Sequence, residues 1–82
     1  MALVLPPEPD SDAFRVLAAV RDAPGMIVSA LAEYTDLSRG GVSRILSRLE
    51  EAGLVEEIEA FDRRARAWRT TRKGAKWARE HA

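Results

Sequence analysis

The chain has 82 residues, enough for one small domain, and its 13 basic and 13 acidic residues leave no net charge. This balance argues against a uniformly basic, histone-like chain, and a hydrophobic content of 46% indicates a globular protein. The absence of cysteine excludes disulfide scaffolds, zinc fingers, iron–sulfur clusters and cysteine nucleophiles. The single histidine, His81, is the penultimate residue, so we place no catalytic or metal site on it.

The first residues show no targeting signal. The apolar stretch Met1–Leu5 is short, has no basic flank and stops at Pro6-Pro7. A membrane span needs about 20 apolar residues, and a secretory signal needs a longer apolar core after positive charge. We therefore expect a cytoplasmic protein that does not enter a membrane.

An extended arm and a helix are predicted at the start of the chain. Three prolines make residues 1–9 an arm, and the domain is expected over residues 10–82. The first helix begins near Asp10 or Ser11, because either side chain can cap it. Its apolar residues recur at i, i+3, i+4 and i+7, and Pro24-Gly25 ends it.

The next segment predicts a short strand and a second helix. Residues 26–28 are too few for anything but an edge strand or an extended lead-in. Ser29 is expected to cap a helix that continues to about Tyr34, and residues 35–37 form the turn that follows.

A third helix has the clearest pattern in the sequence. Ser38 is a strong cap, and Gly53 stands where a left-handed residue ends a helix. The residues between them present one apolar stripe, formed by Val42, Ile45, Leu46 and Leu49.

A hairpin and a last helix complete the predicted fold. Strands are expected over residues 54–59 and 66–70 with a turn at 61–65, and Thr71 can cap the helix that follows. Trp68 is expected in the core. The order predicts a mostly helical α+β fold: a winged helix-turn-helix with a three-helix core, a two-stranded wing, a short extra strand and a C-terminal helix.

The zero net charge conceals an uneven distribution. Residues 1–38 contain two basic and six acidic residues, whereas residues 39–82 contain eleven basic and seven acidic residues. The extreme is residues 61–76, with seven basic residues against Asp62 alone. Such a basic cluster in a neutral chain is typical of a surface that binds a polyanion, although a charge run can also be an ordinary solvated surface.

The third helix suits the major groove of duplex DNA. With its apolar stripe turned to the core, helical geometry places Gly40, Arg44 and Ser47 on the opposite side, flanked by Ser43 and Arg48. Arginine can bind guanine bidentately, serine can bind a base or a phosphate, and glycine lets the backbone approach closely. The candidate DNA-binding residues are Ser38, Arg39, Gly40, Ser43, Arg44, Ser47, Arg48, Arg63, Arg64 and Arg66.

Residues 31–55 resemble the helix-turn-helix of MarR-type regulators. The resemblance continues in Asp62-Arg63-Arg64-Ala65-Arg66, which is similar to that family's Asp-x-Arg wing. Thr71 and Gly74 are similar to the Leu-Thr-x-x-Gly motif that follows the wing. The resemblance covers roughly residues 26–78. Thr70 stands where the family has leucine.

This resemblance implies sequence-specific binding of double-stranded DNA by a homodimer, with repression as the usual outcome. It also implies that Arg64 enters the minor groove while Asp62 orients it, and that Arg63 and Arg66 serve phosphates. The chain ends soon after its fourth helix, so we expect a minimal version without the family's long terminal dimerisation helices and without its ligand pocket. No cofactor is expected.

Other functions remain as alternatives. A winged helix can also serve as a protein-interaction or assembly module without specific DNA binding. The acidic pairs Glu50-Glu51 and Glu56-Glu57 fit solvated surface better than an acid–base or metal site, so an enzyme is not expected. A dimer interface could use residues 2–5, the first helix or the face of Trp77, although Trp77 could equally fill the core.

Overall fold

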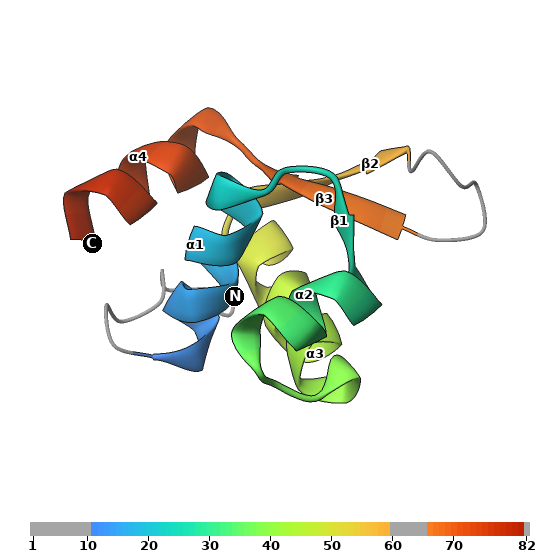
Figure 1. Ribbon diagram of the computed structural model, residues 1–82. Helices are drawn as coiled ribbons and strands as arrows, with labels where there is room; N and C mark the ends of the chain where they lie inside the picture. The colour runs from blue at the N-terminus through green and yellow to red at the C-terminus, as the bar shows by residue number, and fades with distance from the viewer. Residues whose placement is uncertain (1–10, 60–65, 82) are drawn as a thin grey trace.

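A computed structural model describes residues 11–59 and 66–81 of the chain. Its elements are α1 (Asp12–Asp22), β1 (Met26–Ile27), α2 (Val28–Thr35), α3 (Arg39–Glu51), β2 (Val55–Glu59), β3 (Arg66–Thr70) and α4 (Arg72–His81). Helices α1, α2 and α3 pack together, the β2–β3 hairpin extends to one side and α4 lies at the other (Figure 1). The predicted mostly helical α+β fold is confirmed, whereas the predicted arm, residues 1–9, lies outside the described residues.

The start of α1 follows from its cap. The Ser11 hydroxyl accepts a hydrogen bond from the backbone N–H of Phe14 at 3.1 Å, as predicted for a serine at this position. The apolar stripe of the helix is buried, and Val16 and Leu17 have no exposed surface. The backbone is extended again at Met26, where β1 begins.

The predicted start of α2 is wrong by two residues. Ile27 precedes the helix, and no side chain caps it, so Ser29 lies inside the first turn instead of capping it. The reason is that β1 runs directly into α2, since Met26 and Ile27 pair with β3 opposite Trp68 and Ala67. Sheet pairing therefore fixes where this helix begins, and a sequence pattern does not show that pairing.

Helix α3 is bounded as predicted. The Ser38 hydroxyl accepts a hydrogen bond from the Gly41 N–H at 3.0 Å, and Gly53 has a φ of 77° just past the last turn. The N–H groups of Gly53 and Leu54 donate to the carbonyls of Glu50 and Leu49, which is the Schellman arrangement. The predicted apolar stripe faces the core, with Ile45 only half-buried.

The sheet has the order β1-β3-β2, and both pairings are antiparallel. Trp68, on the central strand, is 4% exposed and belongs to the core, as expected. The short edge strand and the two strands of the wing fall where the sequence predicts them. Across the described residues, no helix combines the length and the apolar character that crossing a bilayer requires.

A close junction fixes the start of α4 to the end of α3. The Thr71 hydroxyl accepts from the Gly74 N–H at 3.0 Å, which confirms the predicted cap, and it donates to the Gly53 carbonyl at 2.6 Å. Lys73 Nζ donates to the Ala52 carbonyl at 2.9 Å. A Cβ atom at Gly74 would lie 1.8 Å from the Leu54 carbonyl oxygen, so only glycine allows this approach.

Candidate nucleic-acid interface

The exposed face of α3 carries most of the sequence-predicted site residues. Val42, Leu46 and Leu49 hold the helix against the core with at most 2% of each residue exposed. The opposite side is open to solvent and presents Ser38, Arg39, Gly40, Ser43, Arg44, Ser47 and Arg48. These seven residues form the exposed surface of the helix, which we call the α3 face; Arg44 and Arg48 lie on one side of it, and Arg39, nine residues before Arg48, lies toward the groove beside α2.

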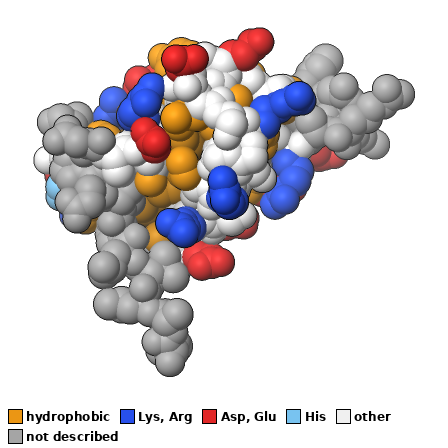
Figure 2. Space-filling model, turned by 90° about the horizontal axis from the view of Figure 1, so that it is seen from below, with side chains coloured by type: hydrophobic (Ala, Val, Ile, Leu, Met, Phe, Trp, Pro, Cys, Tyr) orange, Lys and Arg blue, Asp and Glu red, His pale blue; other side chains and the backbone are white. Residues whose placement is uncertain are grey.

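Three arginines give the α3 face its positive charge. Within residues 11–59 and 66–81, no carboxylate forms an ion pair with Arg39, Arg44 or Arg48. Asp12 lines a shallow hollow together with Arg44 and Arg48, but its ion pair is with Arg15, at 3.4 Å. On the side of the molecule where α3 lies, Lys and Arg side chains are spread across the surface, with Asp and Glu side chains at several places among them and a hydrophobic area between them (Figure 2).

The serines and glycines of the α3 face have different local roles. Ser38 is engaged as the helix cap, and the Ser47 hydroxyl donates to the Ser43 carbonyl at 3.2 Å. A Cβ at Gly41 would lie 3.0 Å from the Ser38 hydroxyl, so glycine there leaves room for the cap. A Cβ at Gly40 would meet nothing within 4 Å. Packing within the described chain therefore gives no reason for glycine at position 40.

The wing differs from the sequence prediction in its charge. Arg66 Nη2 lies 2.6 Å from Glu57 Oε2, and Arg69 Nε lies 2.5 Å from Glu56 Oε1. The pKa of the Arg66 guanidinium is raised above its ordinary value because Glu57 accepts its hydrogen bond and attracts its charge. Both described arginines of the hairpin are thus compensated within it. Asp62, Arg63 and Arg64 lie outside the described residues.

The described residues of the basic run, which lie within 66–76, do not form one surface. They are divided between β3, which lies in the wing, and α4, on the other side of the molecule (Figure 1). On α4, Lys73 donates to the Ala52 carbonyl, and Lys76 lies 4.0 Å from Glu80. Sequence proximity had suggested a single cluster, but the hairpin and the following helix point away from each other.

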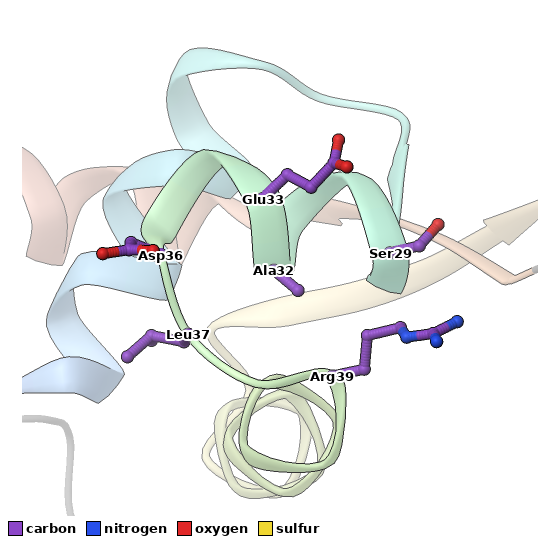
Figure 3. Close-up of a pocket in the computed structure, with 6 residues that line it drawn as sticks. All are labelled: Ser29, Ala32, Glu33, Asp36, Leu37 and Arg39. Carbon is purple, nitrogen blue, oxygen red and sulfur yellow. The ribbon is translucent and has the colours of Figure 1, made fainter.

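An open groove between α2 and the start of α3 was not predicted. It has a volume of about 590 Å³ and is lined by Ser29, Ala32, Glu33, Asp36, Leu37 and Arg39. The side chains of Ser29 and Arg39 extend toward the same side of the groove, whereas Asp36 lies at its other end (Figure 3). The groove borders the α3 face but has a mixed charge, and it could not be predicted from sequence patterns because it arises from the packing of two helices.

The helix pair α2–α3, joined by a tight turn and followed by the β2–β3 hairpin, defines a winged helix-turn-helix domain. A family model described as the MarR family matches residues 6–65. The chain therefore belongs to the MarR family, as its sequence motifs indicate.

Solved structures of MarR-family regulators share the fold. MarR from E. coli is 26% identical with a TM-score of 0.82, and the match covers 87% of this chain and 53% of that one. PcaV from Streptomyces coelicolor is 28% identical with a TM-score of 0.81, covering 90% and 55%. FabT from Streptococcus pneumoniae, solved in complex with DNA, is 26% identical with a TM-score of 0.77, covering 84% and 49%. The chain spans about half the length of these structures. None of the curated proteins matches the sequence.

Proposed function

We propose that this protein is a transcriptional regulator that binds double-stranded DNA in a sequence-specific manner. In this proposal α3 enters the major groove and the tip of the wing, with Arg63 and Arg64, reaches the minor groove or the flanking phosphates. The observation that carries it is the α3 face, where three arginines stand free of carboxylate partners in the described chain. Membership of the MarR family, and a DNA complex of a relative with the same fold, support the same function.

The physical chemistry of the α3 face favours duplex DNA over other polyanions. A single helix fits the major groove, and its exposed side can carry both base-reading and phosphate-binding groups. Arg44 and Arg48 are one helical turn apart, so both can address the groove from the same side. Gly40 adds a point at which the backbone itself can approach the DNA.

The proposal includes a homodimer in the cytoplasm and repression rather than activation. A dimer would place two α3 faces on one duplex and double the number of contacts. Repression follows when such a dimer occupies a promoter. These parts of the proposal are based on the family resemblance and not on the geometry of the α3 face.

The alternative, a protein-interaction module, has less support in the structure. Such a module needs an exposed apolar patch. Among the described residues, Tyr34 is the one large hydrophobic side chain that is mostly exposed, at 58%. The other large hydrophobic side chains of the described chain, including those of the hydrophobic area in Figure 2, are at most partly exposed, so this alternative comes second.

The test is fluorescence anisotropy with a mixed-sequence DNA duplex over a series of salt concentrations. Each phosphate that is neutralised contributes about −0.9 to the slope of log affinity against log salt. We expect Arg44→Ala and Arg48→Ala each to weaken binding and to make the slope shallower by about 0.9. A selection from random duplexes would then identify the operator.

Arg79→Ala is the matched control, because Arg79 is also an exposed arginine but lies on α4. It removes the same charge from the chain and should leave the slope unchanged. No binding by the unaltered protein, even at low salt, would overturn the proposal and favour the interaction module. Equal effects of all three substitutions would show that binding depends on net charge and not on the α3 face.

A further inference from the structure

We infer that Arg66 positions the wing through Glu57 and Trp68 and makes no phosphate contact of its own. This inference rests on the proposed function and changes what the sequence suggested for Arg66. It removes Arg66 from the set of predicted phosphate contacts.

Three groups on one face of the hairpin form a cluster, which we call the wing-base cluster: Glu57, Arg66 and Trp68. The register places Glu57 directly opposite Trp68, and Arg66 is two residues before Trp68 on the same strand, so all three side chains share one face. The guanidinium lies 2.6 Å from Glu57 and 5.1 Å from the centroid of the Trp68 ring. One charged group is thus held from two sides, by a carboxylate and by an aromatic face.

The cluster connects the wing to the core. Trp68 is almost completely buried and belongs to the core cluster that includes Leu17 and Leu46. Its ring is therefore held in place by the helices, and Arg66 is stacked on a fixed surface. Since Arg66 is the first residue of β3, anchoring it fixes the beginning of this strand to Trp68.

The charge around Arg66 opposes a phosphate contact. Glu57 already accepts a hydrogen bond from the Arg66 guanidinium and offsets its positive charge. A phosphate that met the remaining N–H groups of Arg66 would lie close to the Glu57 carboxylate, and the repulsion between these two anions would offset part of the attraction to the guanidinium.

The other face of the hairpin shows the same compensation. Glu56 and Arg69 are direct cross-strand partners, and their side chains are 2.5 Å apart. Residues 55–59 and 66–70 together contain three acidic and two basic residues. The described part of the wing is thus not a basic surface, in contrast to the α3 face.

The test uses the same anisotropy assay with four variants: Arg66→Gln, Arg66→Lys, Arg69→Gln and, as the positive control, Arg44→Gln. We expect Arg44→Gln to make the salt slope shallower by about 0.9, while Arg66→Gln and Arg69→Gln leave it unchanged. Arg66→Gln should lower the affinity by less than about fivefold, because exposed ion pairs contribute little. Arg66→Lys should not restore that loss, since an ammonium cannot reproduce the planar stacking of the guanidinium.

A second measurement is independent of DNA. In the free protein, Arg66→Gln should shift the NMR signal of the Trp68 indole N–H and leave that of Trp77 in place. The inference is overturned if Arg66→Gln makes the slope shallower by about 0.9 and Arg66→Lys restores it, because Arg66 would then be a phosphate contact. It is also overturned if the Trp68 signal does not move. Failure of the unaltered protein to bind would instead overturn the proposed function.

Discussion

Replacement of Gly74 by alanine should destabilise the domain, although alanine is the better helix former. Gly74 is the third residue of α4, and a Cβ there would lie 1.8 Å from the carbonyl oxygen and 2.7 Å from the carbonyl carbon of Leu54. These atoms belong to the backbone, so they cannot move aside as the end of a flexible side chain would. The helix must shift away from the turn that ends α3.

Three contributions determine the change in the free energy of unfolding, one stabilising and two destabilising. Alanine in place of glycine stabilises a helix by about 1 kcal/mol. Overpacking against a rigid neighbour costs about 1–3 kcal/mol, and we expect the upper end because the clash is with backbone. Loss of the hydrogen bond from the Gly74 N–H to the Thr71 hydroxyl costs about 1 kcal/mol more. The net loss is about 2–3 kcal/mol, against a total stability of roughly 4–12 kcal/mol for a domain of this size.

The assay is urea unfolding followed by tryptophan fluorescence, together with thermal unfolding by circular dichroism. A loss of this size should lower Tm by roughly 10–20 °C. The matched control is Gly40→Ala, the same chemical change in the first turn of α3, where a Cβ meets nothing within 4 Å. It should stabilise the fold by up to about 1 kcal/mol. If Gly74→Ala were neutral or stabilising, the close contact with Leu54 would not exist as described.

Three further predictions concern the cap, the core and the assembly. Ser38→Ala should lower the free energy of unfolding by about 1 kcal/mol, because the Gly41 N–H loses its acceptor. Ser38→Asp should retain most of the stability that the cap provides, since aspartate also accepts this hydrogen bond. Urea unfolding measures both changes. Trp68→Ala should lower the free energy of unfolding by about 3–5 kcal/mol in urea unfolding, and a loss below about 1 kcal/mol would show that the ring is not a core residue. Sedimentation equilibrium should give twice the mass of the chain, and a single-chain mass at micromolar concentration would contradict the proposed homodimer.

The elements that sequence alone predicted well are those set by local signals. The cap and the apolar stripe of α3 were readable because Ser38, Gly53 and the spacing between them act within a few residues. The same holds for Ser11 at α1 and Thr71 at α4. Because the apolar stripe predicted which side of α3 is buried, it also predicted which residues lie on the exposed side.

The features that sequence reasoning missed depend on contacts between distant residues. The start of α2 follows from the pairing of β1 with β3, not from a capping side chain. The compensation of Arg66 depends on a hairpin register that places Glu57 beside it, and a count of charges along the chain cannot show this. The predicted roles of Asp62 and Arg64 concern residues outside the described chain and stay predictions.

The junction between α3 and α4 has a mechanical consequence. Hydrogen bonds from Thr71 and Lys73 to the turn after α3, and the bare backbone of Gly74 against Leu54, join the two helices without a flexible linker. Their relative angle can change only if these bonds break. We therefore expect α3 and α4 to keep one relative orientation as long as these contacts persist.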